Sequence, residues 1–173
     1  KMDGTQVMQF DGVARPYSPV GVKNNILNFY QPSQNILNSV SLSAGSQKMQ
    51  IRLSLSDLRA RDQQPNSEFF RKTINMNMRA KMGKNDFITL ESSVQYNIVK
   101  GVNRPSVGYA ELNAAWPVYL AANVVDVRNM AGTDPTRPGI NAATGRELEW
   151  NPVPAAVNAY YAAYQINNKD DQQ

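Results

Sequence analysis

Four segments of the chain alternate strictly between apolar and polar side chains, and this pattern constrains the fold more than any other feature. In one of them, residues 73–82, Ile74, Met76 and Met78 alternate with Asn75 and Asn77. A period of two is typical of β-strands whose two faces meet different environments. The other alternating segments are residues 39–44, 49–56 and 88–98. Strands of about nine to eleven residues are long enough to cross a lipid bilayer at a tilt.

The connections between these segments differ in length in a regular way. Residues 45–47 and 83–86 are short links, rich in Gly, Ser, Asn and Asp, which favour tight hairpin turns. Residues 59–70 form a longer polar link, and a much longer segment follows the fourth strand. In an up-and-down meander, the short turns then lie on one side and the long loops on the other. This asymmetry is typical of outer-membrane barrels.

The two faces of the predicted strands differ in charge. Charged side chains on the polar face suit a wet lumen, and the candidates for lining it are Arg52, Arg79, Lys81 and Glu91. The other face carries apolar side chains that would meet lipid, such as Leu42, Leu53, Met76 and Leu90. Asp57 falls in phase with this apolar face, and we expect it to mark the outer boundary of the membrane, where a charge costs little.

A soluble β-sandwich also has alternating strands and is the first alternative. Strand length and the charges on the polar face argue against it, because a dry core does not accept several ionised groups. A soluble or cell-surface β-rich glycan-binding module and a passive barrel without energy coupling also remain open. No run of 18 apolar residues is present, so a transmembrane helix is not expected.

Composition excludes several other functions. The chain has no Cys and no His, which removes thiolate metal sites, the Ser-His nucleophile and the commonest general base. Its net charge of +4 comes from scattered basic residues rather than a basic block, so nucleic-acid binding is not expected. The paired acidic residues lack the spacing of a calcium loop. We therefore predict no enzymatic activity, no cofactor and no metal site.

The segments on either side of the strands are predicted to be loops. Residues 1–35 are punctuated by Gly and Pro and should form a packed extracellular loop. Residues 36–98 should be four transmembrane strands in two hairpins. Residues 99–173 should form a long extracellular loop with short helices. We expect short helices on each side of a break at Pro117, and another helix over residues 154–165 that starts at Pro154.

Aromatic side chains are frequent in the last predicted loop. Tyr and Trp are favoured at interfaces, and their rings can also stack on sugars. They are therefore candidates for contact with a substrate or a partner, although they could equally pack the loop segments against one another. The candidates are Trp116, Tyr119, Trp150, Tyr160, Tyr161 and Tyr164.

Several short motifs add a family resemblance. The runs NSVSLSAG, RLSLSDL and PNSEFFRKTINMNMRAK follow one another between residues 38 and 81. In this order they resemble the barrel region of SusC/RagA-type TonB-dependent transporters of the bacterial outer membrane. The resemblance implies a plugged antiparallel β-barrel of about 22 strands, of which this chain would be a fragment with four.

The resemblance also implies partners and cargo. A SusD-like surface lipoprotein would close the extracellular side, and the substrate would be an oligosaccharide or a peptide. Contact with TonB would pass through a region that is absent from this chain, as is the plug. Outer-membrane lipid would surround the barrel.

Overall fold

The computed structural model describes residues 3–21, 23–108, 112–151, 156–166 and 168–172. The chain is mostly β, its strands pair antiparallel, and it divides into two compact units. We call them the sheet unit, which comprises Ser33–Arg61, Glu68–Gly101 and Lys169–Gln173, and the loop unit, which comprises Lys1–Pro32, Asp62–Ser67 and Val102–Asn168.

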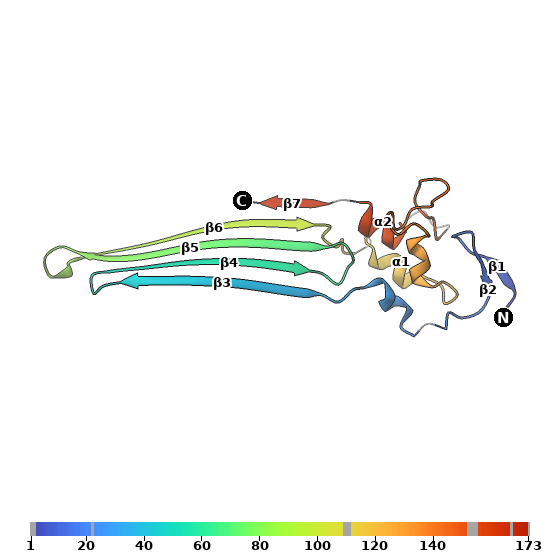
Figure 1. Cartoon of the computed structure of the whole chain (residues 1–173), viewed down its shortest axis with the longest axis horizontal. Helices are drawn as coiled ribbons and strands as arrows, with labels where there is room; N and C mark the ends of the chain where they lie inside the picture. The colour runs from blue at the N-terminus through green and yellow to red at the C-terminus, as the bar shows by residue number, and fades with distance from the viewer. Residues whose placement is uncertain (1–2, 22, 109–111, 152–155, 167, 173) are drawn as a thin grey trace. The chain divides into compact units, whose positions relative to one another are not determined.

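Four long strands dominate the sheet unit, side by side in the order of the sequence (Figure 1). They are β3 (Gln34–Gly45), β4 (Met49–Arg61), β5 (Glu68–Met82) and β6 (Ile88–Val102). β5 and β6 have 15 residues each, against about five or six in a common strand. A fifth strand, β7 (Lys169–Gln172), pairs with β6. The prediction that residues 99–173 contain only loop and short helices is therefore wrong at this end.

Strand register brings like side chains together. Val40 on β3 lies opposite Leu55 on β4, which lies opposite Ile74 on β5. Residues that face each other across antiparallel strands project from the same side of the sheet. The alternation in each strand therefore adds up to one apolar face and one polar face. A shift of one residue would mix them.

The two hairpin turns use different backbone solutions. In the β5–β6 turn, Gly83, Asn85 and Asp86 all adopt positive φ, which these residue types tolerate best. Gly45 at the β3–β4 turn has no such φ. A Cβ there would lie 2.7 Å from the carbonyl oxygen of Met49, so glycine is needed for close approach. Both links were predicted as tight turns, and the structure confirms this.

The buried hydrophobic core of the described residues lies in the loop unit. It is built by η1 (Asn25–Phe29), α1 (Ala115–Leu120), η3 (Val127–Ala131) and α2 (Ala159–Tyr164). Alanines on α2 let the short helix approach its neighbours closely. The buried residues are Phe29, Ala114, Val118, Val125, Val127, Met130, Ala159, Ala162 and Ala163.

Asn158 organises the centre of this core and is fully buried. Its Nδ2 donates to the carbonyls of Met130 and Leu148, both at 2.9 Å. Its Oδ1 caps α2 by accepting from the backbone N–H groups of Tyr160 and Tyr161. One amide thus satisfies groups from three segments that are distant in sequence, as burial of a polar side chain requires.

The start of the chain contains a small hairpin between β1 (Gln6–Met8) and β2 (Ala14–Pro16). The strands are short, as the many Gly and Pro residues of this segment predict. Arg15 binds Asp11 through two hydrogen bonds, of 2.7 and 2.6 Å. This pairing holds the pKa of the Asp11 carboxyl below its usual value.

Two helix predictions need correction. α1 runs through Pro117 instead of breaking there. The proline lies in the first turn, where its missing N–H has no helical partner to lose. The other helix, α2, is shorter than residues 154–165, since Asn158 is its non-helical cap and it begins at Ala159. The predicted start at Pro154 lies outside the described residues. No helix in the described part of the chain is long and apolar enough to cross a membrane.

Candidate functional site on the two faces of the sheet

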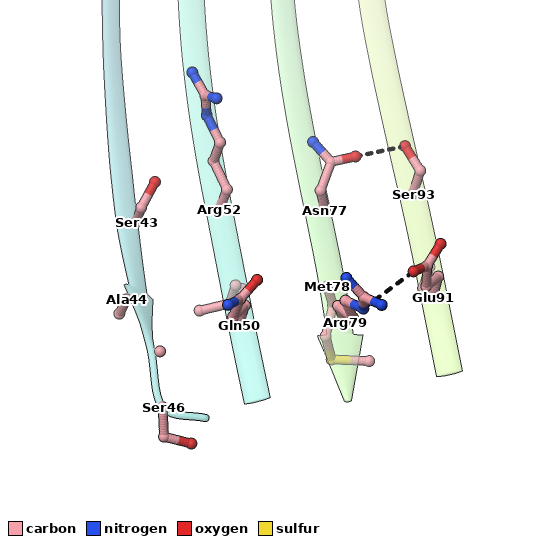
Figure 2. Close-up of a pocket in the computed structure, with 13 residues that line it drawn as sticks. Ser43, Ala44, Ser46, Gln50, Arg52, Asn77, Met78, Arg79, Glu91 and Ser93 are labelled. Atoms are coloured by element: carbon pink, nitrogen blue, oxygen red, sulfur yellow. Dashed lines mark hydrogen bonds and ion pairs between the residues drawn. The ribbon is translucent and has the colours of Figure 1, made fainter. Parts of the chain in front are cut away.

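The polar face of the sheet carries a groove of about 720 Å³ near the hairpin turns (Figure 2). Its lining comes from all four long strands and consists largely of Ser, Asn, Gln and charged side chains. Among those labelled in Figure 2 are Ser43, Gln50, Arg52, Asn77, Arg79, Glu91 and Ser93. Hydroxyl and amide groups hydrogen-bond to water or to polar ligands without a large desolvation cost, so this face is built for a wet environment.

Side-chain contacts bridge β5 and β6 across this face. Arg79 Nε lies 3.2 Å from Glu91 Oε1. The Ser93 hydroxyl donates to Asn77 Oδ1 at 2.7 Å, and the same kind of bond joins Thr73 to Asn97. From one contact to the next, each step forward on β5 is matched by an equal step backward on β6, as expected for antiparallel strands.

The structure places all four predicted lumen-lining residues on this one face. Arg52 lies opposite Asn77, and Arg79 lies opposite Gln50. Glu91 joins them through its ion pair with Arg79. Lys81 follows Arg79 at the two-residue spacing that keeps it on the same side of β5. The groove unites Arg52, Arg79 and Glu91, while Lys81 lies beyond it.

The opposite face is apolar and uncovered within the sheet unit. Leu42 is 70% exposed and Val40 is 63% exposed. Leu53 in β4, Met76 in β5 and Leu90 in β6 are 37–46% exposed. No hydrophobic side chain among the described residues of the sheet unit is buried. The exposed apolar side chains form one contiguous surface four strands wide. Contiguous apolar surfaces of this extent mark interaction sites, whereas single exposed apolar side chains do not.

Charged side chains bound the apolar surface at both ends. At one end, Asp57 lies opposite Lys72, in the row that follows Leu55 and Ile74. At the other end the strands give way to the hairpin turns, where Lys48 of the β3–β4 turn pairs with Asp86 of the β5–β6 turn at 3.7 Å. Lys48 and Asp57 are nine residues apart, or about 30 Å along a strand. The sequence analysis identified Asp57 but missed Lys72. The two-residue spacing of Lys72, Ile74 and Met76 places all three on the same side of β5.

The six aromatic candidates separate into packed and exposed residues. Tyr160 packs edge-on against Phe29 at 5.2 Å between ring centroids, and burial raises its pKa. Tyr164 also packs on the core, as does Trp150, whose Nε1 donates to the carbonyl of Ala156 at 3.1 Å.

The remaining candidates are Trp116 and Tyr161, which are half-buried, and Tyr119, which is 64% exposed. Tyr119 lies beside Tyr30, whose pKa is raised by burial and by this neighbour. Among the six, Tyr119 therefore offers the most free ring surface for a partner or substrate.

The described residues contain no group of His, Cys, Asp or Glu side chains that could hold a metal ion. The sequence analysis did not identify two features of the structure. One is the buried Asn158, which joins distant segments, and the other is the row formed by Asp57 and Lys72. Their roles depend on contacts between distant segments, and in both cases only the paired partner shows what the residue does.

Comparison with known proteins finds no matching family model, no similar curated protein and no similar solved structure.

Proposed function

We propose that this chain forms part of the wall of a TonB-dependent transporter of the SusC/RagA type in a bacterial outer membrane. The complete transporter would import oligosaccharides or peptides together with a SusD-like surface lipoprotein. The chain itself would contribute strands, surface loops and no catalytic group.

The observation that carries this proposal is the division of one long-stranded sheet into an uncovered apolar face and a polar face with ion pairs. The span of about 30 Å from Lys48 to Asp57 becomes about 23 Å across a membrane for strands tilted by about 40°. The apolar band of outer-membrane barrels is about 25 Å tall. The distance between the charged hairpin turns and the Asp57–Lys72 row thus agrees with a lipid-facing wall.

Unpaired strand edges support the same proposal. β3 is an edge of the sheet, and its 12 residues are all exposed. Backbone groups cannot remain unpaired in hydrocarbon, so in a membrane the edge must pair with a further strand. A barrel that contains more strands than those described here would supply this partner.

A soluble glycan-binding module accounts less well for the apolar face. A sandwich would cover this face with a second sheet, whereas the sheet unit contains a single layer. Burying it would require a partner of similar area. Lipid covers such a surface without any further protein.

Under this proposal the two faces have separate tasks. Leu42, Leu53, Met76 and Leu90 meet lipid and hold the strands in the bilayer. Arg52, Arg79, Lys81 and Glu91 line the aqueous interior around a plug. Tyr119 in the loop unit is the best candidate for contact with the lipoprotein or the cargo, because its ring is the most exposed.

Fractionation of cells that produce the complete gene product tests the location. We expect the protein in the outer membrane, resistant to alkaline extraction and released only by detergent. Its electrophoretic mobility should change on boiling, as folded barrels denature only on heating. Recovery in the soluble fraction without detergent would reject the proposal and favour the glycan-binding module.

Uptake measurements then test energy coupling. Cells that depend on this transporter should lose growth on its oligosaccharide or peptide substrate when TonB is deleted or the proton gradient is collapsed. Growth that persists under both conditions would indicate a passive barrel and reject the transporter part of the proposal.

A further inference from the structure

A second groove, of about 540 Å³, lies at the end of the apolar surface bounded by Asp57 and Lys72. Side chains of the apolar face on all four long strands contribute to it. The apolar contributors are Val40, Leu55, Ile74, Tyr96 and Ile98, and the charged ones are Asp57 and Lys72. The groove thus has mainly apolar walls, and its charged side chains lie where the apolar surface ends.

The acidic side chains near this groove form ion pairs with cations other than Lys72. Asp57 accepts a hydrogen bond from Arg59 Nε at 3.1 Å. In the two rows beyond, Arg61 pairs with Glu68 at 3.8 Å and Lys100 pairs with Asp171 at 3.3 Å. Each acid therefore has its own cation, and Lys72 forms no ion pair within the described residues. Lys72 is exposed, so its ammonium group is accessible.

The position of Lys72 along the strand adds to this argument. It lies in the half of the sheet away from the hairpin turns, two rows before the strand ends Arg61 and Glu68, from which the longer connection leaves. In outer-membrane barrels the short turns face the periplasm and the longer loops face outward. The outer leaflet of such a membrane consists mainly of phosphorylated glycolipid.

We propose that this groove binds the phosphorylated glycolipid of the outer leaflet, the lipid A class. A phosphate of the headgroup would contact the Lys72 ammonium, and an acyl chain would lie along Leu55 and Ile74. Basic side chains at a membrane surface attract anionic headgroups, and an aromatic ring such as Tyr96 is favoured at the same depth. This inference rests on the proposed function, since it requires the apolar face to meet lipid.

The test uses the complete protein, purified from outer membranes in a mild non-ionic detergent and stripped of lipid. Native mass spectrometry measures how much added lipid A remains bound, in comparison with dephosphorylated lipid A and phosphatidylglycerol. The variants are Lys72→Gln, Lys72→Arg and, as a matched control at the other end of the apolar surface, Lys84→Gln.

We expect the wild type to retain at least fivefold more lipid A than either comparison lipid. Lys72→Gln should lower retention to the level of the dephosphorylated lipid, Lys72→Arg should restore it, and Lys84→Gln should leave it unchanged. Equal retention by wild type and Lys72→Gln would overturn the proposal, and so would equal binding of phosphatidylglycerol.

Extraction behaviour separates this inference from the proposed function. If Lys72→Gln enters the outer membrane but binds lipid A like the wild type, only the glycolipid site fails. If the wild-type protein itself is soluble without detergent, the membrane function fails and the glycolipid site fails with it.

Discussion

Asp57 on β4 lies directly opposite Lys72 on β5, in the first row of side chains beyond the apolar surface. One row earlier, Leu55 lies opposite Ile74. The change from two aliphatic side chains to two opposite charges within one row is a sharp boundary. In the proposed membrane setting it would mark the depth at which hydrocarbon gives way to headgroups, because ionised groups are costly only in the hydrocarbon.

Leu53→Arg should impair membrane assembly of the complete protein. Leu53 lies on the apolar face, opposite Leu42 and Met76, in the middle of the apolar surface. An arginine at the centre of the lipid face costs about 2–4 kcal/mol. The measurement is the amount of heat-modifiable protein in the outer membrane.

Ser54→Arg is the matched control, since Ser54 is the next residue and projects from the polar face. It should assemble at the wild-type level. If both variants assembled equally well, the apolar face would not be in lipid.

Arg79 and Glu91 should be weakly coupled. Both side chains are more than half exposed in the sheet unit, and cross-strand ion pairs of this kind contribute about 0.2–1 kcal/mol. A double-mutant cycle with Arg79→Gln and Glu91→Gln measures the coupling in urea unfolding of the complete protein in lipid vesicles. High salt should reduce the coupling if water reaches this face. Salt-independent coupling would instead indicate a dry interior.

Gly139→Ala should destabilise the loop unit more than Gly145→Ala. Both glycines have positive φ, which costs a residue with a Cβ about 1–2 kcal/mol. At Gly139 the added Cβ would also lie 2.2 Å from the backbone nitrogen of Tyr161, whereas at Gly145 nothing lies within 4 Å. Hydrogen exchange of α2 should therefore rise strongly only in Gly139→Ala. Similar exchange in the two variants would contradict the close packing of this loop on α2.

Asp11 should stabilise the β1–β2 hairpin in a pH-dependent way. Hydrogen bonds from Arg15 lower its pKa below 3.8, so folding favours the ionised form. This contribution is fully present above the ordinary pKa and is lost as the pH falls through the lowered one. Asp11→Asn should therefore speed hydrogen exchange of the hairpin relative to wild type at about pH 6, and the difference should shrink as the pH is lowered below 3.8. A difference that persists at the lower pH would mean that charge is not its origin.

Tyr119→Ala should weaken co-purification of the surface lipoprotein without changing the stability of the loop unit. Its ring is largely exposed, so little packing is lost. Tyr160→Ala is the contrasting variant, because its ring packs on Phe29 and its removal should cost about 2 kcal/mol. Unchanged lipoprotein recovery with Tyr119→Ala would remove this residue from the proposed contact.

Local patterns in the sequence were sufficient to predict the long strands and their two faces. Alternation such as Ile74-Asn75-Met76-Asn77 has a period of two residues, which fits a strand and not a helix. Gly83, Asn85 and Asp86 tolerate positive φ and therefore favour a tight turn. These features depend on neighbours a few residues away. Alternation alone places Arg79 and Lys81 on one side of β5, whereas bringing Arg52 of β4 and Glu91 of β6 to the same face also requires the register between the strands.

Features that depend on distant neighbours needed the tertiary structure. β7 is too short and too polar to be recognised, and it exists as a strand because β6 supplies the pairing partner. Tyr160 and Trp150 are candidates for binding by residue type, but in the structure both side chains pack against the core. Their residue types suit both roles equally well, so composition could not decide between them.

The sequence by itself determined the amphipathic character of the sheet, because side-chain alternation follows directly from strand geometry. Only the tertiary structure decided which residues share a row, and therefore that Lys72 faces Asp57 and that each nearby acid is paired with another cation. The physical reason is register: pairing between strands is set by the turns and by both faces together, and no single strand encodes it.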